Sequence, residues 1–298
     1  MNVKLADVIS LGEIMVESIF ETEADVPVNR TLVVKDEKAA AIGGAAVNVA
    51  WYLDGLGKAV RLIAPISIRH ASTLEREFKK TKVDLTGIIK TKGGTDHLFT
   101  ILFPQGHRSI YTLGATANGL KRKVLNAQES ERAIVLNGGR HQEMREIFSE
   151  LVTKRADVLI AFNPSYAIYE YGSEELVHIL KNCDISFLNE DEYRFAKQFS
   201  RNPLEHLPRA AFVVTKSNKG ALMICRKKQY RYKPEVKHDG VILGAGDACL
   251  AGFLSGLLDG VSPDASMIRG LRVAALVVRH QNIRTKLKAA DRSWVLGV

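Results

Sequence analysis

The chain has 298 residues, of which 46% are hydrophobic and 25% charged, and its formal net charge is +9. These values are typical of a globular chain with one substantial core, and no apolar run is long enough for a membrane span, so we expect no membrane partner. The basic residues are scattered, with no basic run interleaved with aromatic residues, so we expect no nucleic-acid partner.

The N-terminal segment does not have the pattern of a signal peptide, because Asp7 and Glu13 interrupt its apolar residues. The cysteines, Cys183, Cys225 and Cys249, form no CxxC pair and have no histidine at metal-ligand spacing. A sparse, odd number of cysteines fits a reducing compartment. We therefore predict a cytoplasmic location.

Short apolar runs that read as buried strands recur along the chain, and each ends in a turn signal or a polar residue. They lie at 7–12, 60–67, 133–138, 157–164, 185–190 and 211–217. Amphipathic stretches with helical spacing separate them, for example 143–156 and 174–183. This alternation predicts an α/β domain with a mostly parallel sheet covered on both faces.

Ligands of such sheets bind beyond the carboxyl ends of the strands. The polar residues there are Asn163, Asn189, Glu192 and Lys216. We therefore treat them as candidates for a ligand site.

Two stretches, 13–38 and 95–113, break the alternation and contain extended segments without a convincing helix. The sequence Pro-Gln-Gly-His within the second stretch predicts a hairpin turn. We expect these stretches to form a small β-sheet lid on a single domain that spans residues 1–298.

The segment Gly244-Ala245-Gly246-Asp247 precedes apolar residues at helical spacing, so a helix is expected to begin there. The first turn of a helix presents unpaired N–H groups, and small residues let an anion approach them. Asp247 is either a first-turn acid with a structural role or a proton acceptor in phosphoryl transfer.

A second glycine-rich segment, Gly43-Gly44, precedes another helical pattern whose first turn carries Asn48. The stretches GGAAVNVA (43–50) and GAGDACLAGF (244–253) resemble, in order and spacing, the two signatures of the ribokinase-like (PfkB) family of sugar kinases. Further stretches resemble family elements between Gly12 and Asn282, namely FNPSY (162–166), FLNEDEYRF (187–195) and VVTKSNKGAL (213–222).

The resemblance implies a three-layer α/β/α ribokinase-like core with a small β lid. It also implies that ATP with Mg²⁺ donates its γ-phosphoryl group to a hydroxyl of a small sugar or sugar acid. Asp247 would be the general base, and the backbone of Gly244, Ala245, Gly246 and Asp247 would form the anion hole.

The remaining site residues are implied in the same way. Gly43, Gly44 and Asn48 would face the sugar, as would Glu17, which stands where many relatives have an aspartate. Asn189 and Glu192 would serve Mg²⁺ and the phosphates through water. Lys216, Ser217, Gly220 and Asn282 would lie beside the nucleotide.

The sequence departs from the family pattern at three places. Val241, Ile242 and Leu243 replace the D-T-x that helps to hold a monovalent cation in relatives, so we expect weak or absent activation by K⁺. Glu17 is one methylene longer than the usual aspartate, and a second role for it is that of a solvent-facing residue of a lid strand. Ser217 replaces a glycine of the nucleotide loop, which leaves the geometry of that loop and the base preference open.

The motifs leave the acceptor of the phosphoryl group open. The stretch GEIMVE (12–17) also resembles the first strand of 2-keto-3-deoxygluconate kinases, which indicates a sugar acid. A nucleoside kinase of the same fold, or a non-catalytic ligand-binding relative, is also compatible with the sequence. The apolar stretch LFTILF (98–103) is compatible with a homodimer formed through the lid or with a hairpin packed on its own core.

Overall fold

The computed structural model describes residues 6–22, 36–103, 106–112, 131–154, 157–200, 203–204, 207–225, 227–237, 243–280 and 283–297. Its first half contains β1 (Val8–Gly12), β2 (Met15–Glu21), β3 (Asp36–Gly43), α1 (Ala45–Gly55), β4 (Val60–Ser67), α2 (Ile68–Phe78), β5 (Ile88–Thr91), β6 (Asp96–Phe103), β7 (Gly106–Thr112), β8 (Ala133–Asn137) and α4 (Gln142–Thr153).

The second half contains β9 (Leu159–Asn163), the 3₁₀ helix η1 (Ser165–Glu170), α5 (Ser173–Asn182), β10 (Ile185–Asn189), α6 (Glu190–Lys197), β11 (Ala211–Thr215), the 3₁₀ helix η3 (Ser217–Lys219), β12 (Ala221–Cys225), β13 (Lys228–Tyr232), α7 (Ala245–Leu258), α8 (Pro263–His280) and α9 (Ala289–Leu296). Each of the six apolar runs predicted as strands contains a strand of the main sheet.

The main sheet has nine strands in the order β13-β12-β11-β10-β9-β8-β1-β4-β5. All neighbours are parallel except the pairs β11–β12 and β12–β13 at one edge. The predicted fold class, a mostly parallel sheet flanked by helices, is confirmed.

Alternate residues of the central strands face two separate cores, as the two-residue period of a strand requires. Val8 of β1 and Val135 of β8 join the core that also contains buried residues of α1, α2, α7 and α8. Ile9 and Ile134 join the core beneath α4, α5 and α6. Burial on both faces explains the continuous apolar runs in the sequence.

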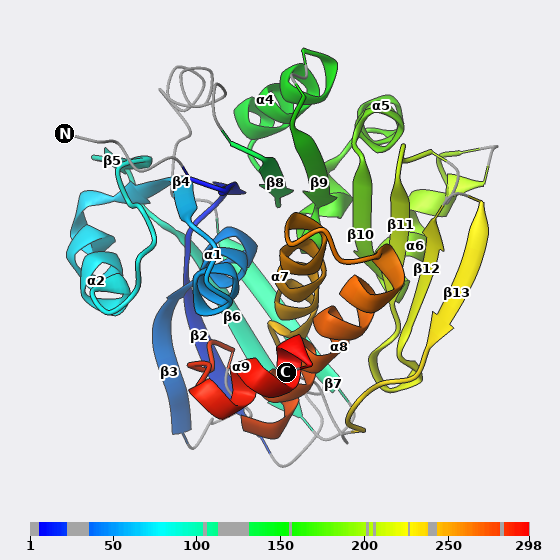
Figure 1. Cartoon of the computed structure of the whole chain (residues 1–298). Helices are drawn as coiled ribbons and strands as arrows, with labels where there is room; N and C mark the ends of the chain where they lie inside the picture. The colour runs from blue at the N-terminus through cyan, green and yellow to red at the C-terminus, as the bar shows by residue number, and fades with distance from the viewer. Residues whose placement is uncertain are drawn as a thin grey trace.

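A second sheet has four strands in the order β3-β2-β6-β7 and lies at the lower side of the view in Figure 1. In this sheet β2 pairs in parallel with β6. Strands β6 and β7 pair in antiparallel fashion, and Phe103 and Gly106 are the register partners next to the predicted hairpin turn. Residues 23–35 of the stretch 13–38 lie outside the described residues, and β3 runs from Asp36 to Gly43. Because β1 leads directly into β2, the small sheet lies at the carboxyl edge of the main sheet.

Helices α1 and α7 pack against each other on one face of the main sheet, with α8 beside α7 (Figure 1). Helix α7 is buried from Ala248 to Gly256, including Leu250, Phe253 and Leu254. This packing fixes the position of the two helix N-termini. Within the described residues, no helix is both long and apolar enough to cross a membrane.

Candidate active site

The two glycine-rich segments, far apart in the sequence, come together through their helices. Gly44 caps α1 and Gly244 caps α7. The Asn48 Nδ2 atom, in the first turn of α1, donates a hydrogen bond to Asp247 Oδ2 over 2.9 Å. The structure therefore joins one predicted sugar-facing residue directly to the predicted general base.

The Asp247 carboxylate accepts one hydrogen bond on each of its oxygens. Asn163 at the carboxyl end of β9 donates from Nδ2 to Asp247 Oδ1 over 3.2 Å, while Asn48 reaches Oδ2. Burial raises the pKa of Asp247 above that of an ordinary aspartate, and the two amide donors act in the opposite direction. A carboxylate in this environment is a stronger proton acceptor than one in water.

Glu17 of β2 points toward the glycine segment. Its Oε1 atom accepts a hydrogen bond of 2.7 Å from the Gly44 amide, and a Cβ atom at Gly43 would overlap its carboxyl group. Burial raises the pKa of Glu17 and the charge of Asp247 raises it further, while the Gly44 amide and Arg284 oppose this effect. The half-buried Glu17 thus faces the same site as Asp247.

Both helix caps need glycine for conformational and steric reasons. Gly44 has φ 101°, and a Cβ there would lie 2.7 Å from the Glu13 carbonyl oxygen. Gly244 has φ 79°, and a Cβ would lie 2.8 Å from Ile283 Cγ2. At exposed Gly246 a Cβ would meet no described atom within 4 Å, so the first turn of α7 is open to a ligand.

Asn189 and Glu192 form a capping box at the start of α6. Asn189 Oδ1 accepts from the Glu192 amide over 2.9 Å, and Glu192 Oε2 accepts from the Asn189 amide over 2.9 Å. Burial raises the pKa of Glu192 to about 7, and the charge of Asp247 contributes to this rise. The capping box therefore lies within electrostatic reach of the predicted base.

Three of the residues expected beside the nucleotide, Lys216, Ser217 and Gly220, lie in the tight turn between β11 and β12. The Lys216 amide donates to the Gly220 carbonyl over 2.8 Å, and Ser217 adopts a positive φ of 47°. An ion pair of 3.7 Å between Lys219 and Glu190 connects this turn to α6. No hydrogen bond among the described residues joins the turn directly to Asp247.

The structure does not describe all of the predicted site residues. Asn282, Val241 and Ile242 lie outside the described residues, and the expected insensitivity to K⁺ therefore stays a prediction. Among the residues that are described, no group of three or more His, Cys, Asp or Glu side chains is arranged to hold a metal ion. The Asn189–Glu192 pair supplies oxygen atoms of the kind that bind hydrated Mg²⁺ through water.

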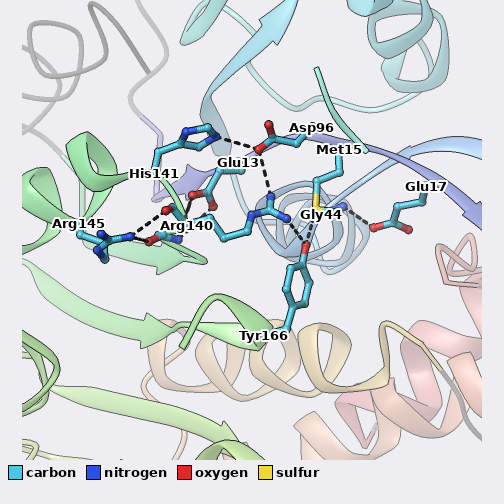
Figure 2. Close-up of polar contacts among 10 residues, drawn as sticks. Glu13, Met15, Glu17, Gly44, Asp96, Arg140, His141, Arg145 and Tyr166 are labelled. Carbon is cyan, nitrogen blue, oxygen red and sulfur yellow. Dashed lines mark hydrogen bonds and ion pairs between the residues drawn. The ribbon is translucent and has the colours of Figure 1, made fainter. Parts of the chain in front are cut away.

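A polar cluster around Arg140 was not predicted from the sequence (Figure 2). Arg140 donates to the Tyr166 hydroxyl over 2.9 Å and forms an ion pair of 3.3 Å with Asp96 at the start of β6. The Glu13 carboxylate accepts a 2.7 Å hydrogen bond from the Arg140 amide. These contacts connect the loop after β8 to the small sheet.

A cavity of about 10 Å³, roughly the space for one water molecule, lies beside this cluster. Met15, Gly44, Asn137, Arg140 and Tyr166 are among its lining residues.

Comparison with known proteins gives consistent matches along the chain. The family model for "pfkB family carbohydrate kinase" matches residues 5–290. A nucleoside kinase of Methanocaldococcus jannaschii is 24% identical over 300 residues, which cover 98% of this chain and 97% of that protein.

Solved structures share the fold. The nucleoside kinase of Burkholderia thailandensis in complex with inosine has a TM-score of 0.84 at 18% identity and covers 97% of each chain. A structure of that kinase with ADP-inosine has a TM-score of 0.80. The ribokinase of Thermotoga maritima has a TM-score of 0.80 at 20% identity, over 99% of this chain and 100% of that chain.

Proposed function

Because the chain belongs to the PfkB family of carbohydrate kinases, we propose that it transfers the γ-phosphoryl group of ATP to a hydroxyl of a small sugar. The observation that carries this proposal is the Asp247 carboxylate at the N-terminus of α7, held by Asn48 from the other glycine segment. Phosphoryl transfer requires mainly positioning and charge stabilisation, and this arrangement offers both.

In the proposed reaction Asp247 accepts the proton of the attacking hydroxyl. The hydroxyl oxygen forms a bond to the γ-phosphorus, and the bond between that phosphorus and the β–γ bridging oxygen breaks to release ADP. The N–H groups from Gly244 to Asp247 stabilise the negative charge that develops on the phosphoryl oxygens. Mg²⁺, when bound, neutralises phosphate charge, and Asn189 and Glu192 would hold its water ligands.

The acceptor would bind between the small sheet and the main sheet, next to Glu17, Gly43, Gly44 and Asn48. The buried Asn48 Oδ1 atom has no hydrogen-bond partner among the described residues, so it is available to a donor hydroxyl of the acceptor. The small sheet would cover the bound acceptor and exclude water from the reacting groups.

We favour a neutral acceptor over a sugar acid. Glu17 and Asp247 place two carboxylates at the site, and the charge of each disfavours an anion nearby. Two cations whose charges act on Glu17 are already paired, Arg140 with Asp96 and Arg284 with Glu77.

A nucleoside acceptor is the second candidate. It is supported by the match along nearly the whole chain to the nucleoside kinase of M. jannaschii and by the inosine complex of the B. thailandensis enzyme. A nucleoside carries a ribose hydroxymethyl group that can meet the same base, so the two candidates share one mechanism.

The test is ADP release with ATP and Mg²⁺ across pools of sugars, sugar acids, polyols and nucleosides. We expect one neutral pool to be active and Asp247→Asn to lower kcat about a thousandfold or more. The matched control is Asp264→Asn, an exposed aspartate in the first turn of α8, which should retain wild-type turnover. Full activity of Asp247→Asn would refute the assignment of the base.

A further inference from the structure

The side chain of Asn163 lies between Asp247 and a second buried asparagine, Asn137. Its Nδ2 atom is 3.2 Å from Asp247 Oδ1 and 3.1 Å from Asn137 Oδ1. Asn137 and Asn163 are register partners at the carboxyl ends of β8 and β9, which places both amides at one edge of the main sheet. Asn163 is 6% exposed and Asn137 is 1% exposed, so bulk water does not replace these contacts.

The orientation of the Asn137 amide is fixed by its other neighbours. Its Nδ2 atom faces three oxygens, Ser10 Oγ at 3.2 Å and the carbonyl oxygens of Leu11 and Val135 at 3.3 Å each. Ser10 gives its own proton to the Ala46 carbonyl over 2.8 Å, so Ser10 Oγ acts as an acceptor toward Asn137. Carbonyl oxygens only accept hydrogen bonds, so the NH₂ group of Asn137 must face them.

This orientation determines that of Asn163. With its NH₂ group turned toward the backbone carbonyls, Asn137 presents Oδ1 to Asn163. Asn163 must therefore present its own NH₂ group, and the two hydrogens of that group serve Asn137 Oδ1 and Asp247 Oδ1. The direction of donation thus runs from Asn163 toward Asp247 and not the reverse.

We propose that Asn163 is a positioning residue that holds Asp247 as an oriented proton acceptor, anchored through Asn137 to the backbone of β1 and β8. This inference rests on the proposed function of Asp247 as the general base. Donors on both carboxylate oxygens disfavour a proton on either of them and fix the plane of the carboxyl group. The remaining lone pairs stay available to an acceptor hydroxyl.

Other charged or titratable groups also face Asp247, and the test must separate their effects. Glu17 on β2, Tyr52 on α1 and Glu192 on α6 each have a pKa to which the charge of Asp247 contributes. The hydrogen bonds that Asp247 accepts come instead from Asn48 and Asn163. Substitution of Asn163 leaves the three titratable groups in place, so a change in titration can be assigned to the lost donor.

Two variants of Asn163 test the proposal. Asn163→Ala removes the amide that donates to Asp247. The isosteric Asn163→Asp keeps the shape of the side chain but places a second carboxyl group at hydrogen-bond distance from that of Asp247. We expect kcat at pH 7 to fall by about 10- to 100-fold in both, with KM for the acceptor changed less than about threefold. In the pH dependence of kcat, the midpoint of the acid limb should shift to higher pH by about one unit in Asn163→Ala and by more in Asn163→Asp.

A matched control is Asn182→Ala at the end of α5, which removes an amide that donates to the His178 carbonyl over 2.8 Å, in a different part of the fold. It should leave both kcat and the acid limb unchanged. A loss of kcat in the Asn163 variants without a shift of the acid limb, or a change confined to KM, would overturn the proposal.

A second readout does not depend on turnover. In protein labelled with ¹³C at the aspartate carboxyl groups, the Asp247 signal is assigned by its absence in Asp247→Asn and titrated without substrates. A higher midpoint in Asn163→Ala supports the role of Asn163 even if no acceptor is phosphorylated, in which case the proposed function alone fails. An unchanged midpoint overturns the inference while the proposed function stands or falls on the ADP assay.

Discussion

Glu192 offers a stability test whose magnitude follows from the structure. Its side chain is 5% exposed, and burial raises its pKa from an ordinary 4.5 to about 7. Between these two pH values the folded state holds a proton on Glu192 that the unfolded state has lost. The free energy of unfolding therefore falls as pH rises through this window.

The size of the effect follows from the two pKa values. The difference between 4.5 and about 7 is equivalent to about 3 kcal/mol of stability lost by pH 8. Glu192→Gln removes the titration but keeps an amide oxygen that accepts from the Asn189 amide. We therefore expect the variant to gain about 3 kcal/mol relative to wild type between pH 4.5 and pH 8.

The assay is urea unfolding at several pH values from 4.5 to 8, without nucleotide or Mg²⁺. The difference between variant and wild type cancels the other titrating groups and isolates Glu192. Glu174→Gln, an exposed position in the first turn of α5, makes the same change without burial and serves as the control for the substitution itself. If the Glu192→Gln difference stayed constant with pH within about 0.5 kcal/mol, burial would not govern this carboxyl group.

Two further predictions concern the stability of segments that surround the proposed site. Asp96→Asn should lower the free energy of unfolding by about 3 kcal/mol, because it leaves the buried guanidinium of Arg140 without its anionic partner; a loss below about 1 kcal/mol in urea unfolding would contradict this. Gly220→Ala should lower the free energy of unfolding by at least about 1–2 kcal/mol, since Gly220 has φ 85° and a Cβ would overlap the Tyr232 carbonyl oxygen. A thermal midpoint equal to that of wild type would refute the steric argument.

The parts of the fold that depend on local patterns were predictable from the sequence. Apolar runs bounded by turn signals gave the strands of the main sheet, because burial on both faces leaves a continuous signal. Glycines ahead of apolar helices located the starts of α1 and α7, since a positive φ at Gly44 and Gly244 requires that residue type. The convergence of Asn48 and Asp247 followed only from the resemblance to a family, because no spacing rule connects them.

The cluster around Arg140 was not predictable in this way. Asp96 opens β6 in the small sheet, whereas Arg140 follows β8 in the main sheet. Their contact depends on how the two sheets meet, which no local periodicity encodes. Ser217 shows a related limit, because only the structure reveals that this serine takes the positive φ that glycine would adopt more readily.

The charge distribution supports the proposed site without reference to any relative. Glu17, Glu192 and Asp247 come from three different elements, and in each of them burial is the main cause of a raised pKa. The charge of Asp247 raises the pKa of Glu17 and of Glu192, and such unfavourable terms must be offset by interactions elsewhere in the fold. The burial of α7 from Ala248 to Gly256 and of the central strands contributes to that offset. Perturbed pKa values of this kind cluster at functional sites. Of these three carboxylates, Asp247 is the one that meets both an open helix N-terminus and two oriented amide donors.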